Sequence, residues 1–187
     1  MKTADEFLKI RAALLYVINK FPEGVDYIKL FKILYFAQKQ HLVTYGRVIV
    51  NDTFHADKHG PVPSFSYSAL KAKERNNCTK DFDAFLDGIT IFNKKVKSTM
   101  VPDLDELSVS DIECLDKSLK KYSAKFSYFL SALSHDEAWD SARKRKLEDP
   151  ENDRMTVIEI AKAGKAKDGM IDYIRDVQLI KRSVSCG

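Results

Sequence analysis

The first twenty residues carry apolar side chains at helical spacing. Thr3 has the position of an N-cap, and Glu6 three residues later completes a capping box. Pro22 and Gly24 end the pattern. The spacing predicts an amphipathic helix that packs one face on a core. Its apolar stripe consists of Phe7, Ile10, Leu14, Val17 and Phe21.

The next segment, residues 26–42, is apolar on nearly every helical face. Asp26 is the candidate N-cap, and Tyr45 and Gly46 end the region in a turn. Because a helix that is apolar all round is buried on several sides, we expect this helix to be the central element of the domain. Its apolar residues are Ile28, Leu30, Phe31, Ile33, Leu34, Tyr35, Phe36 and Ala37.

After residue 46 the hydrophobic period changes to two. The β-branched and aromatic residues of 47–50 and 53–58 predict a short β-ribbon, broken at Asn51 and Asp52. The stretch 60–63 follows as a rigid turn, because its two prolines fix φ and remove two backbone donors. We expect the ribbon and this turn to project as a rigid edge.

The middle of the chain has weaker patterns. Residues 64–75 predict a third helix, and Phe82 belongs to a short helix. Residues 89–101 favour strands that extend the ribbon into a small sheet. Together with the first two helices, these elements indicate a mostly α member of the α+β class, with a helical domain around a buried central helix.

Helical signals dominate after residue 107. Capping boxes are predicted at 110–113, 134–137 and 156–159. Further helices are expected over 125–133 and 168–183. The polar break near Pro150 divides a domain at 1–147 from a C-terminal helical extension at 148–187, which either packs on that domain or forms a separate unit.

Composition narrows the class of protein. Hydrophobic residues make up 44% and charged residues 31%, which is typical of a globular domain. The net charge of +4 is too small to indicate nucleic-acid binding by itself, and no apolar run is long enough to cross a bilayer. The three cysteines are widely spaced, so we expect neither a disulfide framework nor a zinc site, and a cytoplasmic location.

Candidate chemistry is sparse. His55 and His59 could form a metal site with Asp57 and His41, but solvent-facing residues in a strand explain the spacing more simply. His135 could act as a general base, although packing beside a helix cap explains it better. Motifs for nucleophilic, phosphate-binding or zinc-dependent catalysis do not occur, so we expect a protein without cofactor or metal that is not an enzyme. A small metal-dependent enzyme around His55 and His59 is the third interpretation.

Basic residues near the C-terminus offer a different function. The two helices after Met155 have the rough length of a helix-turn-helix, with Gly164 near the turn. The second interpretation is therefore a DNA-binding transcriptional regulator, although a solvated helix end explains the basic run equally well. The candidate nucleic-acid contacts are Arg143, Lys144, Arg145, Lys146, Lys165 and Lys167.

Three sequence blocks resemble the SocA-like antitoxin family, also called the Panacea domain. Residues 29–37 match its K-L-x-K-L-L-Y-F-A helix, with Phe31 and Ile33 as ordinary apolar variation. The turn at 45–47, the aromatic strand at 54–56 and the Gly-Pro-Val-Pro stretch at 60–63 continue the match. The blocks at 107–119 and 133–139 resemble the second half of the family, so the likeness covers residues 5 to 145.

The resemblance implies a protein-binding antitoxin of bacterial or phage-associated type. Members of the family bind and neutralise a toxin encoded beside them, and one member delivers its toxin to a AAA+ protease. The partner expected here is therefore a cognate toxin protein, with a AAA+ protease as a further candidate; membrane contact is not expected, and the oligomeric state stays open. The partner-binding candidates, for each of which core packing is the competing explanation, are Tyr35, Phe54, His59, Gly60, Pro61, Val62, Pro63, Phe65, Tyr67, His135 and Trp139.

Overall fold

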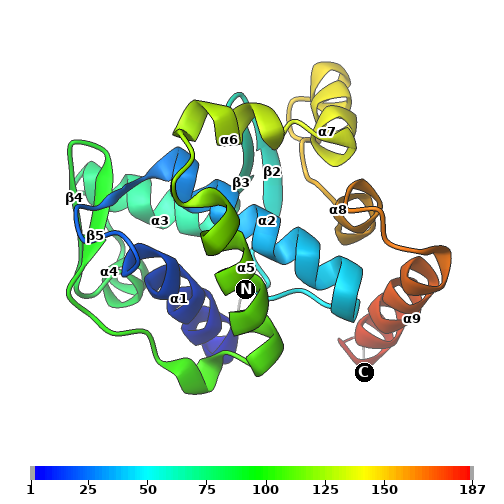
Figure 1. Cartoon of the computed structure of the whole chain (residues 1–187), viewed down its shortest axis with the longest axis horizontal. Coiled ribbons are helices and arrows are strands. Elements are labelled where there is room, and N and C mark those ends of the chain that lie inside the picture. Colours follow the sequence, from blue (N-terminus) through cyan, green and yellow to red (C-terminus); the bar gives the residue numbers. More distant parts are fainter. Residues whose placement is uncertain (1–2, 186–187) are drawn as a thin grey trace.

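The computed structural model describes residues 3–185 and confirms an α+β fold that is mostly helical (Figure 1). In chain order the elements are α1 (Ala4–Ile18), β1 (Val25–Asp26), α2 (Tyr27–Tyr45), β2 (Phe54–Asp57), β3 (Gly60–Pro63), α3 (Ser64–Glu74), α4 (Lys80–Phe85), β4 (Ile89–Phe92), β5 (Lys95–Ser98), a short 3-10 helix (Leu104–Glu106), α5 (Val109–Tyr122), α6 (Ser127–Leu133), α7 (Glu137–Glu148), α8 (Val157–Ala163) and α9 (Asp168–Ser185).

Helix α2 is the central element, as its apolar pattern predicts. It runs through the middle of the molecule and separates two hydrophobic cores (Figure 1). Ile33 and Leu34 pack into the core formed with α1, α3, α5 and the three-stranded sheet. Tyr35 and Phe36 pack into a second core with β2, α7, α8 and α9. Burial on both sides explains why the segment is apolar around its whole circumference.

The segment 47–50 is not a strand, which corrects the predicted ribbon. The amide of Gln38 on α2 takes the place of a neighbouring strand. Its oxygen accepts hydrogen bonds from the backbone N–H groups of Ile49, at 2.9 Å, and Val50, at 3.3 Å. Its Nε2 donates to the carbonyl of Val50 at 3.2 Å. One side chain thus satisfies the backbone groups that a ladder would otherwise pair.

The partner of β2 is β3, so the predicted turn at 60–63 is a strand. The antiparallel register places Ala56 opposite Pro61 and Phe54 opposite Pro63. Both prolines are tolerated because β3 has no second neighbour in its two-stranded sheet. All four residues of β3 are buried, so the prediction that this stretch projects from the surface is wrong.

The strands β4 and β5 form a separate sheet with β1, in the order β1-β5-β4. They do not extend the β2–β3 hairpin, as the sequence led us to expect. The register pairs Val25 of β1 with Val96 of β5, and Ile91 of β4 with the same Val96. Val96 is fully buried, so this sheet belongs to the core on the α1 side of α2.

Helix caps were predicted with mixed success. The capping boxes of Thr3 with Glu6 and of Thr156 with Glu159 are confirmed. Helix α5 is capped by Ser108 with Asp111, not by Ser110 with Glu113. Helix α7 is capped by Asp136 instead of Ser134, because Ser134 is the last residue of the preceding helical turn.

The segment after α7 packs against the second core. Met155 donates its backbone N–H to the carbonyl of Phe54 at 2.8 Å, and Ala56 donates to the carbonyl of Asp153 at 2.9 Å. Ile160 of α8 and Ile171 of α9 are buried in the same core as Tyr35. Among the described residues, none of the helices combines the length and apolar character needed to cross a membrane.

Candidate functional site

Segments far apart in the sequence meet at the β2–β3 hairpin. Helix α2 passes under the hairpin, and α6 and the start of α7 lie beside it (Figure 1). Residues of α2, the hairpin and the α6–α7 junction contact one another here. We call these residues the Lys32 cluster; its members are Lys32, Tyr35, Gly60, Pro61, Ser131, Ser134, His135, Asp136 and Trp139.

Lys32 is the buried cation at the centre of this cluster. Only 1% of the residue is exposed, and its Nζ donates a hydrogen bond to the carbonyl of Pro61 at 2.8 Å. Burial lowers the pKa of Lys32 to about 7, although Asp57 and Asp26 act in the opposite direction. Lys32 is thus a long polar side chain in the interior, and its hydrogen bond connects α2 to strand β3.

Gly60 allows the close approach between the hairpin and its support. Its φ is +93°, and a Cβ at this position would lie 2.7 Å from Cε of Lys32 and collide with Oγ of Ser134. On the other side of the turn, the hydroxyl of Ser131 donates to the carbonyl of His59 at 3.0 Å. The turn is therefore fixed to α6 by both shape and hydrogen bonding.

Asp136 joins α2 to α7. Its carboxylate caps α7 by accepting the N–H of Trp139 at 3.2 Å. It also accepts hydrogen bonds from the hydroxyl of Tyr35 at 2.8 Å and from Nζ of Lys39 at 2.7 Å. Burial, followed by the Asp136 charge, raises the pKa of Tyr35 well above its usual value, so the hydroxyl stays a donor.

Trp139 joins α7 to the hairpin and reaches the surface. Its indole Nε1 donates to the carbonyl of Asp57 at 2.9 Å. Its ring stacks on His135 with centroids 3.8 Å apart and an interplanar angle of 10°, and the Arg143 guanidinium lies 5.7 Å from it. Burial and the positive charge of Lys32 lower the pKa of His135, so the stacked imidazole is neutral at pH 7.

The predicted partner-binding residues divide into buried and accessible groups. Tyr35, Phe54 and residues 60–63 are buried, so they support the site from inside and are not accessible to a partner. Phe65 is half-buried and packs edge-on against other aromatic rings, Phe7, Phe82 and Phe85. His59, Tyr67 and His135 are exposed and Trp139 is half-buried, so these four can touch a partner directly.

The predicted histidine pair does not come together as a metal site. Nδ1 of His55 lies 2.5 Å from Oδ1 of Asp153, whereas the ring of His59 contacts the ring of Tyr128. Residues 3–185 contain no group of three or more His, Cys, Asp or Glu side chains arranged to hold a metal ion.

The basic run at the end of α7 is largely engaged within the protein. Arg145 forms an ion pair with Glu159 and also donates to the carbonyl of Arg154. Lys146 forms an ion pair with Asp153 at 2.5 Å. The exposed members of the candidate nucleic-acid set are Lys144, Lys165 and Lys167.

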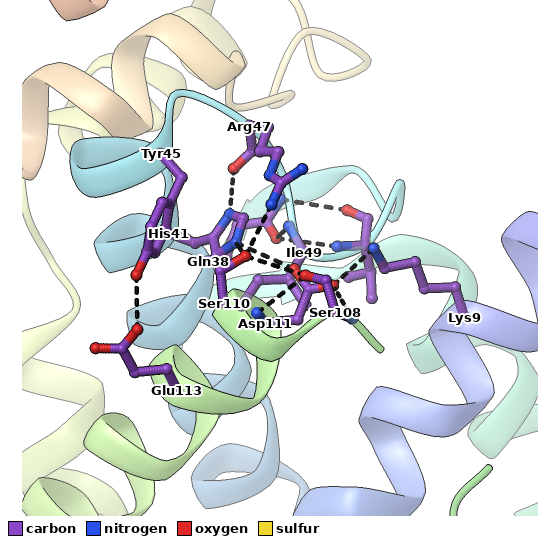
Figure 2. Close-up of polar contacts among 11 residues, drawn as sticks. Lys9, Gln38, His41, Tyr45, Arg47, Ile49, Ser108, Ser110, Asp111 and Glu113 are labelled. Atoms are coloured by element: carbon purple, nitrogen blue, oxygen red, sulfur yellow. Dashed lines mark hydrogen bonds and ion pairs between the residues drawn. The ribbon is translucent and has the colours of Figure 1, made fainter. Parts of the chain in front are cut away.

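The other half of α2 carries a second polar network, centred on His41 (Figure 2). Nδ1 of His41 lies 2.7 Å from the carbonyl of Arg47, and its Nε2 lies 3.0 Å from Oγ of Ser110 and 3.1 Å from Oδ1 of Asp111. Lys9 of α1 forms an ion pair with Asp111 at 2.8 Å. We call these five residues the His41 cluster.

Burial and hydrogen bonding together determine the protonation states of His41 and Asp111. Burial lowers the pKa of His41, despite the nearby Arg47 carbonyl and the Asp111 charge, so the ring is neutral at pH 7. Burial alone would raise the pKa of Asp111, but hydrogen bonds from Lys9 and Ser108 outweigh it and lower that pKa. Ser110 and Asp111 face the same ring nitrogen, whereas a nucleophilic triad places its acid on the other nitrogen.

Sequence reasoning missed an exposed apolar surface on α6. Phe126 is 85% exposed and Tyr128 is 75% exposed, and Tyr128 lies next to the hairpin turn, where its ring contacts that of His59. The stretch from Phe126 to Leu133 lacks charged residues, which resembles a core segment. The sequence alone carries no local signal for which side of this helix meets the core.

A family model described as the antitoxin SocA-like, Panacea domain matches residues 30–140, which is more than half of the chain. No curated protein and no solved structure gives a significant match. The matched range includes every member of the Lys32 cluster and ends directly after Trp139. The chain therefore belongs to the SocA-like antitoxin family, defined by its Panacea domain.

Proposed function

We propose that this protein neutralises a cognate toxin by binding it with the surface around the hairpin turn and the α6–α7 junction. The observation that carries the proposal is the convergence of the family's separate sequence blocks on one cluster. Lys32 comes from the first block, Gly60 from the second and Trp139 from the third, and hydrogen bonds join all three parts.

Rigidity of this surface favours binding. The carbonyl of His59 is held by Ser131 and the carbonyl of Asp57 by Trp139, so the turn between β2 and β3 is fixed before a partner arrives. A surface that is already ordered loses little conformational entropy on association. Aromatic side chains such as Trp139 commonly supply a large share of the binding energy at interfaces.

We further propose that neutralisation is stoichiometric and needs no catalysis by this chain, and that it takes place in the cytoplasm. Lys32 has the chemistry of a nucleophile when its amine is neutral, because a neutral amine can attack a carbonyl. Its burial makes it inaccessible to a substrate, and its hydrogen bond to Pro61 gives it a supporting role.

Co-expression with the product of the adjacent gene tests the proposal. The neighbour alone is expected to stop growth, and this protein is expected to restore it. A Trp139→Ala variant should restore growth poorly, whereas Leu147→Ala, an exposed apolar residue on the same helix, should act like the wild type. A neighbour that is harmless by itself, or toxicity that the wild-type protein does not relieve, contradicts the proposal.

Transfer of the bound toxin to a AAA+ protease is a separable part of the proposal. Repeating the growth assay in a strain that lacks the protease distinguishes the two routes. Rescue that disappears with the protease supports degradation, whereas unchanged rescue supports neutralisation by binding alone. Toxin half-life, measured after synthesis is stopped, gives an independent readout.

A further inference from the structure

Four exposed apolar side chains gather at helix α6. Phe126 is 85% exposed, Tyr128 75%, Phe129 52% and Leu133 44%. We call these residues the α6 patch. Phe126, Phe129 and Leu133 follow the helical spacing of three and four residues, so they form one stripe on the outside of the helix. Clustered exposed apolar residues of this kind usually mark an interaction site.

The opposite side of α6 is firmly anchored. Leu130 is completely buried in the second core, and Ser131 is 5% exposed and bonded to the carbonyl of His59. At the start of the helix, the Ser127 hydroxyl donates to the Asp26 carboxylate at 2.5 Å. The α6 patch is therefore presented by a helix that is fixed to the domain.

The α6 patch is continuous with the hairpin turn. The rings of Tyr128 and His59 meet edge to face, with centroids 6.3 Å apart. Because the Ser131 hydroxyl also holds the carbonyl of His59, the turn is fixed beside the Tyr128 end of the patch. The patch thus extends the accessible side of the Lys32 cluster.

The chain segment around the patch carries only positive charge. Every charged residue between positions 120 and 134 is a lysine: Lys120, Lys121 and Lys125. Nζ of Lys125 lies 5.9 Å from the ring centre of Phe129, whereas the exposed turn before His59 carries one charge of each sign, Asp57 and Lys58. The carboxylate of Asp26 is already engaged by Ser127 and by the backbone of Lys29.

We propose that the α6 patch is the docking surface for the toxin, and that the toxin presents an apolar surface flanked by carboxylates. This inference rests on the proposed function. Aromatic side chains with a basic rim fit such a partner by burial at the centre and by charge complementarity at the edge. An anionic bilayer is a poorer fit, because membrane-surface helices are usually longer and carry their cations on their own polar face, whereas α6 has seven residues and no charge.

Binding of the purified neighbouring gene product tests this docking surface. The double variant Phe126→Ala/Tyr128→Ala is expected to raise its Kd at least about 30-fold, the loss typical of a single hot spot. Val109→Ala is the matched control: Val109 is also 85% exposed but lies at the far end of α5, about 20 Å along that helix. Circular dichroism should show both variants folded, because neither removes a buried side chain.

Charge reversal gives a second, independent measurement. Lys121→Glu/Lys125→Glu is expected to lower the association rate at low salt about tenfold and to lose that effect at high salt. A double reversal at Lys94 and Lys95, at the turn between β4 and β5, changes the net charge equally and should leave the rate unchanged.

The outcomes separate this inference from the proposed function. If the toxin binds the wild type and the α6 double variant equally well, the docking surface is wrong while the antitoxin function stands. If it binds neither protein, both proposals fail. Cosedimentation with phosphatidylserine vesicles, or concentration-dependent self-association, that the double variant abolishes while toxin binding persists would assign the patch to a membrane or to a second copy and overturn the inference.

Discussion

The two halves of α2 each carry a buried polar cluster, and the clusters differ in how the most buried charged group of each is matched. In the His41 cluster the buried carboxylate of Asp111 is paired with Lys9 at 2.8 Å. In the Lys32 cluster the buried amine donates to a backbone carbonyl, that of Pro61. The His41 cluster joins α1, α2 and α5 inside the domain, whereas the Lys32 cluster supports an exposed turn (Figures 1 and 2).

This difference separates structural from functional polar groups. A buried ion pair with additional hydrogen bonds satisfies its own charges and locks the elements that carry it. A buried lysine that forms no ion pair within 4.0 Å among the described residues carries a desolvation cost that helix α2 could avoid with an apolar residue. The hydrogen bond from Lys32 to β3 explains why a lysine occupies this position, because it fixes the strand next to the surface that we assign to toxin binding.

The largest expected effect is that of Gly60→Ala. The positive φ and the collision with Ser134 Oγ should lower the free energy of unfolding by about 3 kcal/mol and disturb the turn that carries His59. Urea unfolding measures the loss, and toxin binding should weaken with it. Gly169→Ala is the control, because no atom lies within 4 Å of the added Cβ; a similar loss in both variants would contradict the argument.

The second effect is a pH dependence that comes from Lys32. Its pKa of about 7 in the folded protein is below the value of about 10.4 in the unfolded chain, so the unfolded state binds more protons between these values. The stability of the wild type relative to Lys32→Met should therefore increase by about 2 kcal/mol from pH 7 to pH 9. Urea unfolding at both pH values measures it; a constant difference would show that the amine stays charged when folded.

Local signals explain which parts of the fold the sequence predicted. The helix limits at Thr3, Asp26 and Thr156 depend on side chains within three residues of the helix start, so they are readable in the sequence. The strand assignment at 47–50 was wrong because Gln38, which lies in the preceding helix, 11 and 12 residues before Ile49 and Val50, occupies the backbone groups. Strand β3 was missed because its prolines are typical of a turn.

The sequence pointed to several residues of the site but not to what each of them does there. The family motifs drew attention to Trp139 and the stretch 60–63, yet burial of that stretch depends on how β2, α2 and α3 pack against it. Lys32 was part of the recognised helix, but a lysine in an amphipathic pattern ordinarily indicates an exposed face. The exposure of Phe126 likewise depends on which side of α6 meets the core, and no local pattern records that.

A smaller effect is expected in the His41 cluster. Asp111→Asn removes the charge that pairs with Lys9 and should lower the free energy of unfolding by about 1.5 kcal/mol at pH 7 while toxin binding is unchanged. Because the pKa of Asp111 is lowered on folding, its contribution is present above the unfolded pKa and lost as pH falls through the folded pKa. The difference between variant and wild type should therefore shrink in acid. Weakened toxin binding by the folded variant would contradict the division between the two clusters.

The smallest effects come from deleting side-chain hydrogen bonds in each cluster. Trp139→Phe keeps an aromatic ring beside His135 but loses the bond from Nε1 to the Asp57 carbonyl. Ser110→Ala loses the contacts of its hydroxyl with Nε2 of His41, the Arg47 guanidinium and the Ser108 hydroxyl. Each should lower the free energy of unfolding by about 1 kcal/mol. The toxin Kd should increase about fivefold for Trp139→Phe but not for Ser110→Ala, because Trp139 bonds to the hairpin turn and Ser110 does not. Isothermal titration calorimetry with both variants checks this. Equal Kd values for the two variants would mean that the turn stays ordered without the Nε1 bond. They would also mean that the two clusters on α2 do not differ in their effect on toxin binding.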